Sequence, residues 1–194
     1  IKRELQVTAD GSHTLFIPEM DEHYHSVNGA VQESRHVFIE AGLHQLEREE
    51  ITVFEVGFGT GLNAFLTLLD AEQHRKRITY YSAELYPLSM EVVQSLNYGE
   101  LISEERKEDF YALHEAEWNV SVPITEHFVL HNCVSSKTTY YNTHNLYHLL
   151  LQAMSVPYEK LQIQDRYKYT QGDKNASEFQ AVLYPEYAIP IHVD

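Results

Sequence analysis

Apolar and polar residues alternate along the beginning of the chain. In "LQVTADGSHTLFI", residues 5–17, the alternation is typical of two strands that each bury one face. The dipeptide Asp10-Gly11 between them accepts the positive φ angles of a tight hairpin turn. The sequence therefore predicts an N-terminal β-hairpin.

Short apolar runs then alternate with segments of helical periodicity. The runs at 51–56, 78–85 and 127–131 are rich in β-branched and aromatic residues and predict three buried strands. Helical spacing predicts helices over 33–46, 61–75, 89–98 and 103–118. The first of these helices is expected to bury Val37, Phe38, Ala41 and Leu46, and the last to take Ser103 as its N-cap. This alternation predicts an α/β fold with a parallel sheet.

The character of the chain changes after residue 132. Seven of the eight glycines lie at or before Gly99, and tyrosine becomes frequent. Residues 143–154 have a helical pattern, and residues 179–184 have the pattern of a strand. We therefore expect one domain over 1–194, made of an N-terminal hairpin and helix (1–50), a cofactor-binding half (51–132) and an atypical tail (133–194).

Composition narrows the class of protein. The formal net charge of −15 disfavours nucleic-acid binding unless a local basic face exists, and the tight basic cluster Arg75-Lys76-Arg77 is more simply the solvated end of a helix. No apolar run approaches the roughly 20 residues that a membrane helix needs. The single cysteine, Cys133, excludes an internal disulfide and suits a reducing cytoplasm, where we expect the protein to be.

The stretch "FEVGFGTGLNAF", residues 54–65, carries the clearest chemistry. Its glycines follow a predicted strand and open a predicted helix, which is the context that turns a glycine pattern into a candidate ligand site. Gly57 and Gly59 allow a sharp turn and close approach of a ligand to the backbone, and Gly61 allows close packing at the helix start. The helix N-terminus offers free N–H groups, and Glu55 offers a carboxylate.

The spacing of these glycines separates the loop from other nucleotide cradles. A P-loop ends in Gly-Lys-Ser/Thr, whereas Gly61 is followed by Leu62, and the even spacing differs from the dinucleotide fingerprint. Glu84, at the end of the second strand, is placed to accept hydrogen bonds from ribose hydroxyls. These features favour a nucleoside without phosphates, such as S-adenosylmethionine; the alternative is a purely structural strand–helix turn.

With its surroundings, the loop resembles a known family. "EVGFGTGLN" and "SAELYP" resemble class I S-adenosylmethionine-dependent methyltransferases with a Rossmann-like sheet. The upstream "MDEHYHSVNGAVQESRHVFIEAGL" resembles the methyltransferase module of the bacterial enzyme that completes 5-methylaminomethyl-2-thiouridine in tRNA (MnmC), as does "LHEAEWN" near Trp118. The resemblance covers roughly residues 5–132. Its recurring upstream positions are Asp21, Glu22, Tyr24, Ser26, Gly29, Glu33, Val37 and Phe38.

The resemblance implies a function. It implies transfer of a methyl group to the amine of an aminomethyl-uridine in tRNA, with a separate oxidase module as a partner enzyme. The implied cofactor-binding residues are Tyr24, Ser26, Glu33, Glu55, Gly57, Phe58, Gly59, Thr60, Gly61, Leu62, Asn63 and Glu84. The family's catalytic Asp lies in an Asp-Ala-Phe-x-Pro motif that this chain does not contain, and Glu186 is the nearest candidate. After a strand at 179–184 only ten residues remain, so we expect a sheet that is incomplete or atypical at its C-terminal end.

Other functions stay open from the sequence. One is a catalytically degenerate S-adenosylmethionine-binding protein, and another is an aminopropyltransferase-like enzyme, which shares the fold. The histidine pairs His23/His25 and His144/His148 have spacings that allow shared metal binding, but twelve histidines make chance pairs common. We therefore expect surface or core histidines and no metal.

Overall fold

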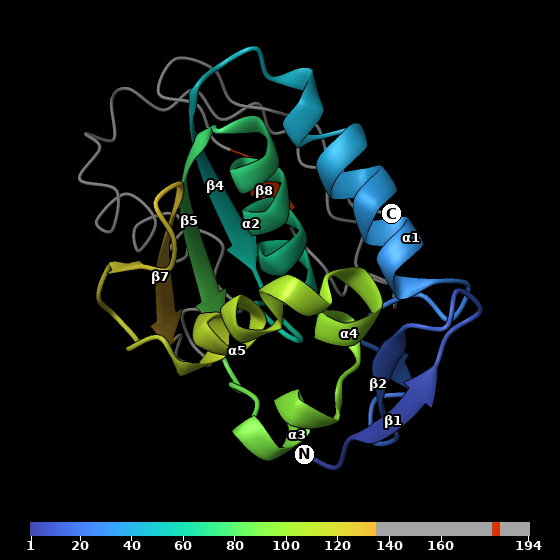
Figure 1. The fold of residues 1–194 in the computed structure, drawn as a ribbon. Coiled ribbons are helices and arrows are strands. Elements are labelled where there is room, and N and C mark those ends of the chain that lie inside the picture. The colour runs from blue at the N-terminus through green and yellow to red at the C-terminus, as the bar shows by residue number, and fades with distance from the viewer. Residues whose placement is uncertain (135–179, 183–194) are drawn as a thin grey trace, which may run out of the picture.

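The computed structural model describes residues 1–134 and 180–182. Its centre is a sheet of five strands in the order β6-β7-β5-β4-β8, shown in Figure 1 with helix α2 lying across one face. Strands β4 (Glu50–Val56), β5 (Arg77–Glu84) and β7 (Phe128–Val134) are parallel neighbours. The predicted α/β fold with a parallel sheet is therefore confirmed.

The two outer strands of this sheet run the other way. β6 (Val122–Pro123) pairs antiparallel with β7, and β8 (Gln180–Val182) pairs antiparallel with β4. The strand predicted at 179–184 therefore exists within that range, at the edge formed by β4. The helix predicted at 143–154 lies outside the described residues.

The predicted hairpin is also confirmed. β1 (Glu4–Val7) and β2 (His13–Ile17) pair antiparallel, and the short β3 (Glu22–His23) extends their sheet. Gly11 takes φ +83° in the turn, as the sequence predicts. Asn97 and Tyr98 fix the hairpin to the rest of the domain: the Asn97 side chain bonds His13 N and Gly11 O, and the Tyr98 hydroxyl donates to His13 O.

The helix expected over 33–46 is broken into three parts, which is a correction to the sequence prediction. α1 (Ala30–Ser34) passes into a π-helical stretch, η1 (Arg35–Glu40), and a 3₁₀ turn, η2 (Leu43–Gln45), follows. The wider π turn, in which Ala41 N bonds His36 O, shifts the helical register. Ile39 and Leu43 are consequently buried, whereas Val37 is 47% exposed, so the predicted apolar face was wrong.

The remaining helices follow the sequence more closely. α2 (Leu62–His74) matches its prediction, α3 (Met90–Ser95) and α4 (Tyr98–Ile102) divide the next helical segment, and α5 (Lys107–Glu115) follows a 3₁₀ turn, η3 (Glu104–Arg106). Ser103 precedes η3 without a side-chain cap hydrogen bond, and the residue that precedes α5 is Arg106. Within the described part of the chain, no helix is long and apolar enough to cross a membrane.

Aromatic side chains form the core between α2, α5 and the sheet. Phe65 of α2 and Phe110 of α5 lie 5.4 Å apart between ring centroids, and Tyr80 of β5 lies 5.5 Å from Phe128 of β7. All four are at most 2% exposed. Burial of such rings contributes most of the stabilisation that fixes α2, and therefore the loop before it, against the sheet.

Candidate functional site

The glycine loop joins the carboxyl end of β4 to the first turn of α2. Gly57, Gly59 and Gly61 have φ angles of +86°, +53° and +71°, a region in which a side chain is strained. Gly57 N donates to Ala83 O of the neighbouring strand at 2.8 Å, and Phe65 N donates to Gly61 O at 2.9 Å, which begins the helix. The strand–loop–helix context predicted for this stretch is therefore confirmed.

Two side chains lie against the glycines. A Cβ on Gly59 would come 3.1 Å from Cδ1 of Tyr24, and a Cβ on Gly61 would come 2.6 Å from Nε2 of His114. Backbone conformation therefore favours glycine at both positions, and a side chain would force His114 to move at position 61 and would press on the Tyr24 ring at position 59. Tyr24 is held in place by Arg3, whose Nε donates to the Tyr24 hydroxyl at 2.9 Å.

Glu84 closes the loop from the adjacent strand. Its Oε2 accepts from Gly59 N at 2.8 Å, and its Oε1 accepts from Leu85 N and Tyr86 N at 2.8 and 2.7 Å. The residue is 8% exposed. A carboxylate offers about four acceptor positions, so three backbone donors leave room for one more hydroxyl.

A second carboxylate lies beneath the loop. Glu55 is 2% exposed, and its two oxygens accept from Asn63 Nδ2 and from the Tyr80 hydroxyl, each at 2.9 Å. Burial, followed by the charge of Glu55, raises the pKa of Tyr80 well above its usual value, so the phenol keeps its proton. Asn63 Oδ1 is buried and has no hydrogen-bond donor among the described residues.

Two neutral histidines hold the middle of the loop. His25 Nε2 lies 2.6 Å from Thr60 Oγ1, and His114 Nε2 lies 3.1 Å from Thr60 O. Burial lowers the pKa of both imidazoles to about 4, although the Thr60 carbonyl partly offsets this for His114. Near neutral pH His114 therefore donates its Nε2–H to the carbonyl without carrying a charge.

The structure brings some of the site residues expected from the sequence together and leaves others apart. Tyr24, Gly59 and Glu84 meet at the loop. Ser26 and Glu33 form a separate pair, in which Ser26 N donates to Glu33 Oε2 at 3.2 Å. Phe58, Thr60 and Leu62 are at most 4% exposed, so their side chains are packed inside the protein. Glu186 lies outside the described residues.

Sequence reasoning missed several residues of this site. His114, His25 and Tyr80 contact or support the loop, but they come from other elements and carry no local motif. The histidine pair His23/His25 does not converge, because His23 bonds Gln6 while His25 bonds Thr60. The pair His144/His148 lies outside the described residues.

Two of the three side chains in the basic cluster after α2 have partners within the protein. Arg75 caps the helix, Lys76 Nζ donates to Leu46 O at 2.8 Å, and Arg77 forms an ion pair with Glu50. The interpretation of this cluster as the solvated end of a helix is confirmed, because Arg75 is the C-cap residue and both arginines are exposed.

Known proteins resemble this chain over part of its length. Bifunctional tRNA 5-methylaminomethyl-2-thiouridine biosynthesis proteins MnmC are similar: that of Magnetococcus marinus is 37% identical over 81 residues, and that of Burkholderia multivorans is 36% identical over 84 residues. These matches cover 39% and 40% of this chain but only 12% and 13% of the relatives. No protein-family model matches the chain.

A solved structure shows the same fold. The crystal structure of MnmC2 from Aquifex aeolicus superposes with a TM-score of 0.56 and 29% sequence identity, covering 70% of this chain and 43% of the other. The chain therefore resembles MnmC, a tRNA-modifying enzyme, in sequence and MnmC2 in fold, over a part of the length of each.

Proposed function

We propose that this chain is an S-adenosylmethionine-dependent methyltransferase that modifies an aminomethyl-uridine in tRNA. The observation that carries the proposal is the glycine loop with Glu84 at its edge, on a fold shared with MnmC2. The relatives are named for tRNA 5-methylaminomethyl-2-thiouridine biosynthesis. We propose that the present chain takes part in the same chemistry. A tRNA substrate would place the protein in the cytoplasm.

The residues present fit the proposed cofactor. Glu84, which accepts from Gly59 N, has acceptor capacity left for a ribose hydroxyl, and Asn63 Oδ1 is a buried acceptor without a donor in the described structure. A buried acceptor without a partner costs free energy, which a ligand N–H or O–H would recover. S-adenosylmethionine supplies a methyl group on a positively charged sulfonium, a charge that the acidic site would tolerate.

The protein's own residues would act mainly by positioning. Neutral His114 and His25 hold Thr60, Glu84 holds Gly59, and the Glu55–Tyr80 pair supports the first turn of α2 through Asn63. A loop fixed from several sides binds ligand without first having to order itself, and orientation of reactants supplies much of the rate in such transfers. Proton removal from the attacking amine would fall to a carboxylate, for which Glu186 is the candidate from the sequence.

A methyl-transfer assay tests this function. Radiolabelled S-adenosylmethionine is incubated with the purified chain and tRNA bearing aminomethyl-uridine; label in the nucleoside supports the proposal. If the cofactor binds but tRNA gains no label, the chain is a binder without this activity. Transfer to polyamines from decarboxylated S-adenosylmethionine would instead identify an aminopropyltransferase.

A further inference from the structure

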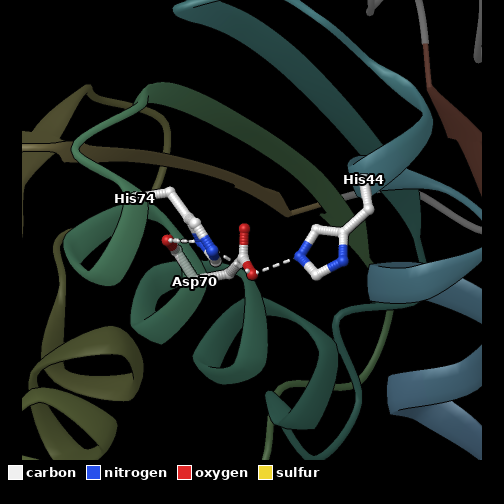
Figure 2. Close-up of side chains that lie close together, drawn as sticks. All are labelled: His44, Asp70 and His74. Atoms are coloured by element: carbon white, nitrogen blue, oxygen red, sulfur yellow. Dashed lines mark hydrogen bonds and ion pairs between the residues drawn. The ribbon is translucent and has the colours of Figure 1, made fainter.

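Three potential metal ligands converge at the far end of α2. Figure 2 shows His44 of η2 pointing toward Asp70 and His74, which lie one turn apart on α2. His44 Nε2 lies 2.6 Å from Asp70 Oδ1, and His74 Nδ1 lies 3.2 Å from the same oxygen. Because α2 runs back from the glycine loop, this cluster is at the opposite end of the helix from the site proposed above.

The carboxylate at the centre of the cluster is incompletely paired. Asp70 is 7% exposed, and its Oδ2 is buried without a hydrogen-bond partner in the described part of the chain. An ionised carboxylate withdrawn from water requires either full hydrogen bonding or a cation. The unpartnered Oδ2 of Asp70 is therefore an observation that points to a ligand, independently of the two imidazoles.

The donor set and its spacing suit a transition metal. A tetrahedral ion with bonds of about 2.0–2.2 Å separates its ligand atoms by roughly 3.3–3.5 Å. The three ligand atoms here all lie within 4.8 Å of one another, so small side-chain rotations would complete the geometry. Two imidazoles and one carboxylate favour zinc and its neighbours over magnesium or calcium, which prefer oxygen ligands.

The surroundings admit and retain a cation. Both histidine side chains are 41% exposed, which gives an ion a path from solvent to the buried carboxylate. His74 is the last residue of α2, where the helix dipole is negative. Lys76, which donates to Leu46 O, already fixes the segment that carries His44, so binding would require little ordering of the backbone.

We infer that His44, Asp70 and His74 form a binding site for one divalent transition-metal ion, which joins η2 to the end of α2. Water would occupy the fourth position, since three protein ligands are present. In the metal-free protein, His44 Nε2 bonds Asp70 Oδ1, and His74 Nδ1 donates to the main-chain carbonyl of Asp70 at 3.0 Å while lying near the same carboxylate; metal binding would replace the protons on these two nitrogens. The role of the ion is to fix the segment between η1 and β4, and it does not depend on the proposed methyl transfer.

Zinc titration of the full chain tests the site. Tag-free protein is stripped with EDTA and titrated with zinc chloride by calorimetry, alongside His44→Gln, His74→Gln and Asp70→Asn. His36→Gln is the matched control, because His36 also bonds a carboxylate one turn away, that of Glu40, without a third ligand among the described residues. Circular dichroism of each metal-free variant checks that it is folded.

We expect the titration to show one zinc ion bound per chain. Each of the three substitutions should weaken this binding by more than about tenfold, since loss of even an outer-shell partner typically costs 10–100-fold, and His36→Gln should not. X-ray absorption of zinc-loaded wild-type protein should show two imidazoles with oxygen ligands, a readout that needs no variant. Absence of saturable binding, equal binding by all variants, or a different imidazole count would overturn the inference.

Discussion

The ring of Tyr24 lies against Gly59, so that a Cβ added to Gly59 would come 3.1 Å from Tyr24 Cδ1. Gly59 also holds φ +53° and donates its N–H to Glu84. One residue of the loop is therefore fixed by backbone conformation, by an aromatic neighbour from the N-terminal segment, and by a carboxylate from the next strand. Substitutions of Gly59 and of Glu84 test these constraints separately.

Substitution of Gly59 should remove ligand binding. Gly59→Val drives a branched side chain against the Tyr24 ring at a backbone position with positive φ, which distorts the loop, and we expect S-adenosylmethionine affinity to fall at least about tenfold in calorimetry. Gly11→Ala is the control: Gly11 also has a positive φ, +83°, but a Cβ there meets nothing within 4 Å. It should lose roughly 1–2 kcal/mol of stability and keep its affinity. Unchanged affinity in Gly59→Val would mean that the loop is structural.

Glu84→Gln should disturb the loop edge without changing its size. The amide nitrogen cannot accept the hydrogen bond from Gly59 N, so one buried donor loses its partner at a cost of about 1–3 kcal/mol. Thermal unfolding measures this loss, and calorimetry should show weaker S-adenosylmethionine binding. The exposed Glu117→Gln is the control. Equal melting temperatures for the two variants would contradict the role of Glu84.

Tyr80→Phe should destabilise the protein from beneath the loop. It removes the hydroxyl that donates to Glu55 Oε2, and loss of a hydrogen bond to a buried carboxylate costs about 1–3 kcal/mol. The neighbouring Tyr81→Phe, at a half-buried position on the same strand, should cost less than about 1 kcal/mol. Denaturant unfolding of the two variants measures the difference, and similar midpoints would show that the Glu55–Tyr80 bond is unimportant.

Stability should decrease as the pH falls from about 6.5 toward 4. His25 and His114 have folded pKa values of about 4, below the ordinary 6.5, so between these values the unfolded chain binds more protons. The loss is at most about 1.4 kcal/mol per pH unit for each histidine, and it levels off below pH 4. Above pH 6.5 both imidazoles are neutral in either state and contribute no slope.

Variants separate this effect from other groups. His114→Gln can still donate to Thr60 O but does not titrate, so its stability should vary less steeply between pH 6.5 and 4. The exposed His36→Gln should keep the wild-type slope. Urea unfolding at several pH values measures the slopes; identical slopes in wild type and His114→Gln would contradict the assignment.

The local sequence predicts most of the sheet and of the loop. β4, α2 and β5 follow from short β-branched runs, helical periodicity and glycines at positive φ, all of which act over a few residues. The broken helix after Gly29 could not be predicted this way, because a π turn at Arg35–Glu40 changes the period on which the apolar face was assigned. Val37 is exposed for that reason.

The supporting contacts of the site depend on tertiary structure. His114 contacts Thr60 across 54 positions of the sequence and Tyr80 contacts Glu55 across 25, and neither pair has a spacing that signals contact.

The cluster of His44, Asp70 and His74 is predictable in part. Asp70 and His74 have the i, i+4 spacing of a helical ligand pair, whereas the approach of His44 depends on how η2 packs against α2.

Cofactor binding to the purified full chain tests the central claim most directly. In isothermal titration calorimetry, S-adenosylmethionine should bind saturably with one site per chain, raise the melting temperature, and lose both effects in Gly59→Val but not in Gly11→Ala. If folded wild-type chain, shown by a cooperative melting curve, gives no binding at millimolar S-adenosylmethionine, the glycine loop is not a methyl-donor site and the proposed function is wrong.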